Sequence, residues 1–293
     1  MYAYNKERLV SYSGELLKRN IPENGWNWLG EKVAMFSGEK GTHHFFSAFM
    51  TAPRFTGKSI LTLTTEEERE LDEIRGGFRL SGFTADRLAR IWLLLHLPEP
   101  DKAAYLKTIN QLFLSAEMNE LVALYSALPV LAFAEDWTVR CTEGIRSNIG
   151  IVLEAIMYDN PFPSERLDEP AWNQMVLKAF FTDKKVDRIA GLDQRANKSL
   201  AYMLSDYAHE RWAAHRTVNP QLWRLVGKFL DERTFPDIQR LFDQGDEREK
   251  ISAALACSQS EYPQAKALLH KLAHLESAIK TNKLSWEILA GGD

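Results

Sequence analysis

The architecture is set by residues 168–227, which read DEPAWNQMVLKAFFTDKKVDRIAGLDQRANKSLAYMLSDYAHERWAAHRTVNPQLWRLVG. Apolar residues recur in this stretch at three- and four-residue spacing, which is typical of helices packed against neighbours. Carboxamides, carboxylates and arginines stand between them. The stretch therefore predicts packed helices with partly buried polar side chains at their contacts. It also holds five tryptophan and tyrosine residues: Trp172, Tyr202, Tyr207, Trp212 and Trp223.

The composition of the whole chain is that of an ordinary globular protein. Its 293 residues are 45% hydrophobic and 26% charged, with a net charge of -4. A nucleic-acid binder usually has a basic face and a high pI. No secretory signal is visible at the start, and the longest apolar run, Ile91–Leu95, is far shorter than the roughly 20 residues of a membrane span. We therefore expect a cytoplasmic protein that neither spans a membrane nor binds nucleic acid.

Helix signals recur along the chain, and strand signals are almost absent. Thr65 with Glu68, and Asp246 with Glu249, match the capping-box spacing that starts a helix. A short alternating β-branched run at residues 60–64 is too isolated to build a sheet. The two cysteines, Cys141 and Cys257, lie in apolar helical surroundings, where small buried thiols are expected.

The second half of the chain contains paired short helices with a cap between them. Residues 236–259 and 262–276 are similar to degenerate two-helix repeats, in which each pair buries its faces against the next. The sequence predicts an all-α fold, an irregular right-handed helical solenoid of stacked HEAT- or armadillo-like helix pairs. An irregular compact helical domain is the alternative. We expect one domain over residues 1–293, with a possible joint at Pro98–Asp101 between an N-terminal cap, residues 1–97, and a repeat part, residues 101–293.

Polar groups on the helix expected at residues 171–181 need partners. Its apolar residues leave Asn173, Gln174 and Lys178 partly withdrawn from water, where polar atoms require hydrogen bonds. Carboxamides in such places usually hold neighbouring loops, and this is the favoured interpretation of Asn173 and Gln174. Contact with a ligand is the alternative.

The helix expected at residues 198–213 places Arg211 on the apolar face that is expected to pack against the core. A guanidinium there cannot lose its proton, so a carboxylate partner is expected, with Asp193, Glu154 and Asp168 as candidates. A structural ion pair is a commoner use of such an arginine than ligand binding.

On the opposite face of that helix, helical spacing brings Asp206, His209 and Glu210 together. The trio could be metal ligands, or a histidine oriented by a carboxylate. A solvated surface is the commoner explanation, and a metal site needs further ligands from elsewhere. No metal and no cofactor is predicted.

Two other places carry candidate binding groups. Arg54 and Lys58 flank a glycine in a bend and could hold an anionic group, although the spacing is not that of a P-loop. Asn148 lies in a strongly apolar helix expected within residues 143–163. No nucleophile elbow, dinucleotide fingerprint or kinase signature is present.

The chain resembles the EboA-domain family from about residue 40 to residue 230. The resemblance is carried by APRFTGK, EMNELVALYSALPVL, IRSNIGIVLEAIMYDNPFP, WNQMVLKAFF, GLDQRAN, LSDYAHERWAA and NPQLWRLVG. It implies a role in making or exporting a bacterial secondary metabolite, and it attaches no catalytic role to any residue. Of the candidate residues, those that match the family's pattern are Arg54, Lys58, Asn148, Asn173, Gln174, Asp193, Arg195, Asp206, His209 and Arg211.

Two functions are compatible with these features. The first is a non-catalytic helical adaptor that binds another protein of the same pathway or a small polar metabolite. The alternative is an enzyme acting on an anionic small molecule, with Arg54, Lys58 and Arg211 as the clamp and His209 with Asp206 as the acid–base pair. The candidate ligand-binding residues are Arg54, Lys58, Asn148, Asn173, Gln174, Lys178, Asp193, Arg195, Asp206, His209 and Arg211.

Overall fold

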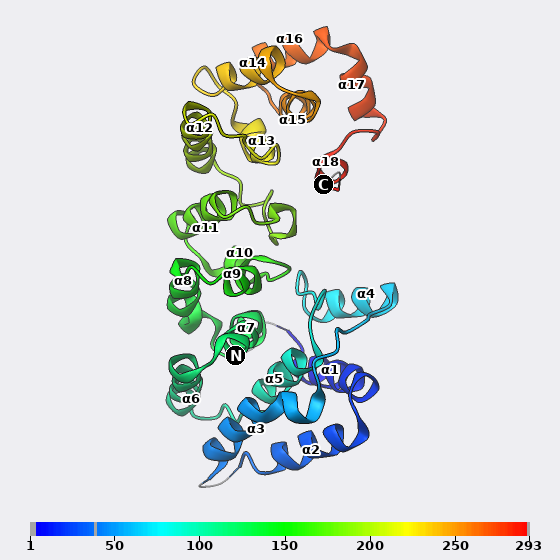
Figure 1. Cartoon of the computed structure of the whole chain (residues 1–293), viewed down its shortest axis with the longest axis vertical. Helices are drawn as coiled ribbons and strands as arrows, with labels where there is room; N and C mark the ends of the chain where they lie inside the picture. The colour runs from blue at the N-terminus through cyan, green and yellow to red at the C-terminus, as the bar shows by residue number, and fades with distance from the viewer. Residues whose placement is uncertain (1–3, 38–39, 292–293) are drawn as a thin grey trace. The chain divides into compact units, whose positions relative to one another are not determined.

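The computed structural model describes residues 4–37 and 40–291, and the regular elements of these residues are helical. The one β-type pairing in this part of the chain is an isolated antiparallel bridge between Ile60 and Thr84. The all-α prediction is thereby confirmed. The helices form two compact units, Met1–Leu167 and Asp168–Asp293, which are described in turn (Figure 1).

The first unit contains ten of the α-helices in the described residues. They are α1 (Lys6–Asn20), α2 (Glu23–Ala34), α3 (Gly41–Thr56), α4 (Thr65–Ile74), α5 (Ala85–Leu95), α6 (Lys102–Ser115), α7 (Met118–Ala127), α8 (Thr138–Arg146), α9 (Gly150–Met157) and α10 (Phe162–Arg166), with two short 3-10 helices at Leu128–Val130 and Ala134–Trp137.

Helix α5 is the centre of this unit. It contacts α1, α3 and α7, and all its residues except Arg87 are buried. A helix that is apolar around its whole circumference has to be surrounded by other elements. Its two other charged residues form a buried ion pair, since Arg90 Nη1 lies 2.6 Å from Asp86 Oδ2.

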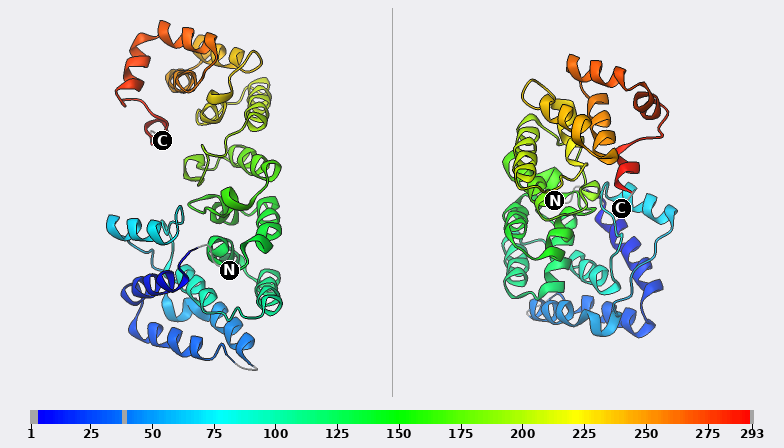
Figure 2. Two further views of the ribbon diagram at one scale, coloured as in Figure 1. Left: turned by 180° about the vertical axis from the view of Figure 1, so that it is seen from behind. Right: turned by 45° about the horizontal axis from the view of Figure 1, so that its top comes forward.

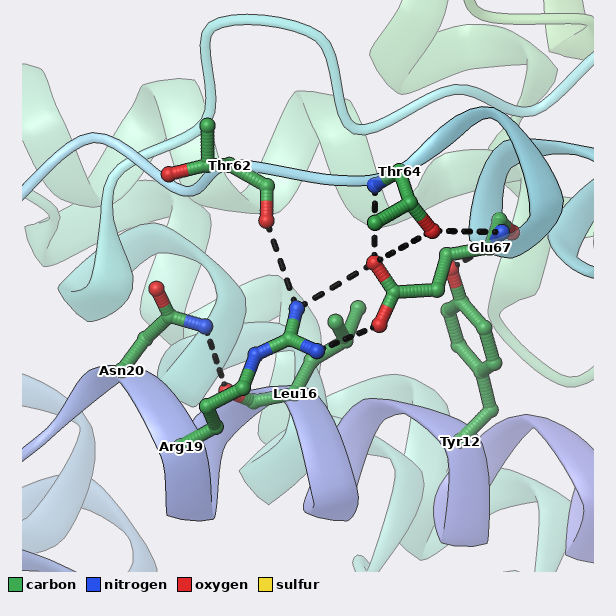
Figure 3. A network of polar contacts seen from close by, with 7 residues as sticks. All are labelled: Tyr12, Leu16, Arg19, Asn20, Thr62, Thr64 and Glu67. Atoms are coloured by element: carbon green, nitrogen blue, oxygen red, sulfur yellow. Dashed lines mark hydrogen bonds and ion pairs between the residues drawn. The ribbon is translucent and has the colours of Figure 1, made fainter.

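A polar network joins α4 to α1 (Figure 3). Thr64 is the N-cap of α4, and Glu67 Oε2 accepts a hydrogen bond from the Thr64 N–H at 2.8 Å. Arg19 on α1 donates to both oxygens of Glu67, at 2.5 and 3.2 Å. The predicted capping box at Thr65 and Glu68 was therefore wrong by one residue, because Thr65 is already helical while Thr64 has the extended backbone of a cap.

The second unit contains the remaining eight α-helices of the described residues. They are α11 (Glu169–Phe181), α12 (Lys198–Ala213), α13 (Leu222–Val226), α14 (Phe235–Gln244), α15 (Glu247–Ser258), α16 (Pro263–Lys271), α17 (Ala273–Lys280) and α18 (Trp286–Ala290), with 3-10 helices at Val186–Arg188 and Gly227–Phe229.

Consecutive helices of the second unit pack on one another. Helix α12 contacts α11 and α13, and α15 contacts α13 and α14. Helices α16, α17 and α18 all contact α15 and follow one another around it (Figures 1 and 2). The predicted helix pair at residues 236–259 is confirmed as α14 and α15, and so is the capping box of Asp246 and Glu249.

One helix differs from the sequence predictions. The apolar helix expected around Asn148 is interrupted, because this residue is exposed in the connection between α8 and α9. Helix α11 buries one apolar face, and Phe181 at its end is 70% exposed.

The two cysteines are free and buried, as predicted. Burial raises the pKa of the Cys141 and Cys257 thiols to about 12. Both groups are therefore neutral and unreactive at physiological pH. None of the described helices combines the length and the apolarity that crossing a lipid bilayer requires.

Replacing Glu67 with alanine is expected to lower the free energy of unfolding at pH 7 by about 1 kcal/mol, because the cap and the bond to Arg19 are both lost. The Arg19 guanidinium and the Thr64 N–H lower the pKa of Glu67 from 4.5 to about 2. Its stabilising effect is therefore complete above pH 4.5 and is lost as the pH falls toward 2. Urea denaturation followed by circular dichroism at several pH values measures this difference.

The matched control is Glu66→Ala, which removes the neighbouring carboxylate without touching the cap. Glu66 pairs with Arg69 on an exposed surface, where an ion pair contributes little. An equal loss of stability in both variants, or a difference from the wild type that does not shrink in acid, contradicts this account of Glu67.

Candidate functional site

An amide pair fixes the start of α12. The Asn173 side chain is buried on α11, and its Oδ1 accepts a hydrogen bond from Asn197 Nδ2 at 2.8 Å. Asn173 Nδ2 donates to Asn197 Oδ1 at 3.2 Å. The same Asn197 oxygen accepts the Leu200 N–H at 2.9 Å, which makes Asn197 the N-cap of α12. Asn173 therefore holds the neighbouring loop, in agreement with the favoured interpretation of this residue.

The other candidates on or after α11 have different environments. Gln174 is exposed, and Lys178 is half-buried. Arg195 lies with its Cζ 5.0 Å from the ring centroid of Trp172. The expectation that Gln174 is withdrawn from water was therefore wrong.

The predicted trio on α12 does not form a cluster. Asp206 binds Arg233 Nη2 through both carboxylate oxygens, at 2.7 and 2.9 Å. His209 Nε2 lies 2.6 Å from Oδ1 of Asp237 on α14. Within the described ranges, no group of three or more histidine, cysteine or acidic side chains is placed to hold a metal ion. His209 is thus oriented by a carboxylate, but by Asp237 rather than by Asp206.

Asp237 and Asp231 fasten α12 to the segment before and within α14. The buried Asp237 also accepts the hydroxyl of Ser205 at 2.6 Å. Asp231 accepts Tyr202 Oη at 2.5 Å and lies 3.1 Å from Lys198 Nζ. Burial alone raises the pKa of Asp231, but hydrogen bonds from Tyr202, Lys198 and two backbone N–H groups outweigh it and lower the pKa to about 2.

Asp193 is paired with an arginine that the sequence reasoning did not select. Arg224 on α13 donates to it in bidentate fashion, Nε to Oδ1 at 2.7 Å and Nη2 to Oδ2 at 2.5 Å. The same Nη2 lies 3.2 Å from Glu287 on α18. Arg224 lies within the motif NPQLWRLVG, so that motif was the available signal.

Arg211 has no carboxylate partner in the part of the chain that the structure describes. Its Nε donates to the Thr217 carbonyl at 2.9 Å, and its side chain is only half-buried. The predicted ion pair with Asp193, Glu154 or Asp168 was wrong. Arg211 lies in the last turn of α12, where the apolar face of the helix is no longer covered by other elements. Its guanidinium stays partly hydrated and therefore does not require a carboxylate partner.

Arg211 and Arg224 line a cavity of about 920 Å³ within the second unit. Its wall is formed by the 3-10 segment after α11, the turn after α12, α13, the start of α15 and α18. Of the eleven candidate residues, Arg211 lines it, and Asp193 holds the lining residue Arg224. The charged lining residues are Asp183, Lys184, Lys185, Asp187, Arg211, Arg224, Asp246, Arg248, Glu249 and Glu287.

The C-terminal helix α18 closes one wall of this cavity through polar contacts. Gln221 Nε2 donates to the Trp286 carbonyl at 2.7 Å, and Arg248 Nη2 donates to the Leu289 carbonyl at 2.9 Å. Sequence reasoning missed Arg248 and Glu287, because the segments that carry them are remote in sequence from α12 and have no recognisable motif.

Three candidates belong to the first unit. Arg54 lies in the last turn of α3, Lys58 follows the left-handed Gly57 that ends this helix, and Asn148 precedes α9. All three side chains are exposed. Their use in binding stays a prediction.

A model of one protein family, described as "Metabolite traffic protein EboA", matches residues 10–227. The match spans α1 to α13, and so includes the amide pair and the turn that carries Arg211. The cavity residues after Gly227 lie outside it. No curated protein and no solved structure gives a significant match to the chain.

The structural role of Asn173 can be separated from ligand binding. Asn173→Ala removes both hydrogen bonds to the half-buried Asn197 amide, and we expect a loss of about 1 kcal/mol in the free energy of unfolding. Gln174→Ala removes the adjacent, exposed carboxamide and is expected to change stability by less than about 0.5 kcal/mol. Chemical denaturation of both variants makes the comparison, and equal effects refute the assignment.

Proposed function

The chain belongs to the EboA family of metabolite traffic proteins, and from this premise we propose that it binds a small polar metabolite in the cavity that Arg211 and Arg224 line. The observation that carries the proposal is the cavity itself. Its volume of about 920 Å³ lies within the range of roughly 300–1,000 Å³ that is typical of small-molecule sites.

The charges of the wall support a polar ligand. Basic and acidic side chains both line the cavity, and several of the acids are already engaged within the protein. Asp246 and Glu249 serve the capping box of α15, and Glu287 lies against Arg224. Among the described residues, Arg211 has a partner only at its Nε, so its two terminal nitrogens can donate to an anionic group of a ligand.

The adaptor interpretation extends this proposal to the whole chain. Other proteins of the same metabolite pathway are the predicted partners, and a right-handed HEAT-like stacking of helix pairs is the predicted arrangement. The consecutive packing of α11, α12 and α13 supports such stacking in the second unit. A cytoplasmic location and the single-domain organisation with a possible joint at Pro98–Asp101 stay predictions as well.

The enzymatic alternative has less support from the geometry. The predicted acid–base pair of His209 and Asp206 is divided, because each residue has a different partner. His209 retains an oriented imidazole beside Asp237, but it is not among the residues that line the larger cavity. A binding role is therefore the better supported of the two.

A thermal-shift screen of the full chain tests the proposal. The probes are a panel of small polar compounds that includes amino acids, hydroxy acids and sugar phosphates. We expect at least one of them to raise the melting temperature. Arg211→Gln is expected to weaken binding of that compound roughly tenfold, because a charge-assisted hydrogen bond is lost.

The control variant is Arg69→Gln, which removes an exposed arginine of the first unit that pairs with Glu66. It should bind the same compound as tightly as the wild type does. A panel in which no compound shifts the melting temperature, or a compound whose affinity is unchanged by Arg211→Gln, overturns the proposal.

A further inference from the structure

A smaller cavity of about 240 Å³ adjoins the larger one in the second unit. Thr217 and Glu249 line both cavities, which are therefore neighbours. Its volume is below the roughly 300–1,000 Å³ of sites that hold whole small molecules, so it suits a single chemical group of a ligand. The rest of its wall consists of Trp212, His215, Arg216, Arg240, Leu241, Gln244 and Gly245.

Arg240 lies over an aromatic ring in this wall. Its Cζ is 4.4 Å from the ring centroid of Trp212, which itself stacks on the buried Trp223. Such a cation–π contact uses none of the hydrogen-bond donors of the guanidinium. Among the residues that the structure describes, none accepts a hydrogen bond or forms an ion pair with Arg240.

A second arginine of the same unit shows what the N–H donors of a guanidinium over an aromatic ring can bind. Arg233 lies over Tyr202 with the same Cζ-to-centroid distance, 4.4 Å. Its Nη2 donates to both oxygens of the Asp206 carboxylate. The two arginines therefore lie equally close to an aromatic ring, and the donors of Arg233 hold an anionic side chain of the protein.

The turn after α12 adds further basic groups to the same wall. His215 has a left-handed backbone, with φ of 54°, and the Arg216 N–H donates to the Arg211 carbonyl at 2.9 Å. This tight turn sets Arg216 beside Trp212 in the cavity wall. The Arg216 side chain forms no ion pair within the described ranges, and the one acidic lining residue, Glu249, accepts the Asp246 N–H.

We propose that the smaller cavity binds the phosphate group of the ligand, with Arg216 and Arg240 as its donors. Two guanidinium groups and a histidine offer more donors and more charge than one carboxylate can use, whereas the several oxygens of a phosphate can accept from all three. This inference rests on the proposed function, since the remainder of the ligand then lies in the larger cavity. The metabolite is accordingly a phosphorylated one.

Titration of the full chain with inorganic phosphate tests the site by itself. The buffer is held at constant ionic strength with chloride, and binding is followed by NMR chemical shifts of the indole N–H groups. We expect saturable binding that Arg240→Gln and Arg216→Gln each weaken roughly tenfold or more. Arg233→Gln is the matched control, because it removes an arginine equally close to an aromatic ring whose Nη2 is bound to Asp206, and it should change the affinity less than twofold.

Three outcomes overturn the inference: no saturable phosphate binding, an equal loss in Arg233→Gln and Arg240→Gln, or acetate binding as tightly as phosphate. The two experiments distinguish a failure of this inference from a failure of the proposed function. If a compound of the polar panel binds through Arg211 while phosphate does not bind, the inference fails and the metabolite site stands. If phosphate binds through Arg216 and Arg240 while the whole panel fails, the phosphate site stands and the proposed function is withdrawn.

Discussion

The amide pair of Asn173 and Asn197 is the constraint on which the candidate site depends. Asn173 is buried on α11, so its amide needs a partner inside the protein, and the half-buried Asn197 supplies it through two hydrogen bonds. Because Asn197 also caps α12, the pair sets where that helix begins. Sixteen residues later the helix ends in the turn that carries Arg211 and Arg216. Two neutral amides thus determine where the basic groups of the cavity walls stand.

Two carboxylates then fix α12 along its length. Asp231 binds Tyr202 near the start of the helix, and Asp237 binds Ser205 and His209 further along it. A helix held at several points keeps its terminal turn in one place, so the donors of that turn lose little freedom when they meet a ligand. Preorganisation of this kind lowers the entropic cost of binding without any new contact.

Periodicity within one helix was enough to predict much of the fold. It gave the bounds of α12 and the buried face of α11, and the similarity to two-helix repeats gave the pairing of α14 with α15. It was not enough for the partners of polar residues. His209 and Asp237 are 28 positions apart on different helices, and no local pattern links them. Arg211 lies on the apolar stripe by spacing, yet burial ends before its turn, so the stripe predicted a carboxylate that the residue does not need.

The difference between buried and exposed polar groups explains why the smaller cavity could not be predicted from the sequence. A buried polar group has to be paired inside the protein, and the pairing of Asn173 could be anticipated for that reason. An exposed arginine such as Arg240 or Arg216 keeps its hydration, so its N–H donors need no partner within the folded protein. Carboxylates are not scarce, because the chain has 40 acidic against 36 basic residues, and Arg233 has one. The contact with the Trp212 ring uses none of the hydrogen-bond donors of Arg240. Those donors therefore remain available to a ligand.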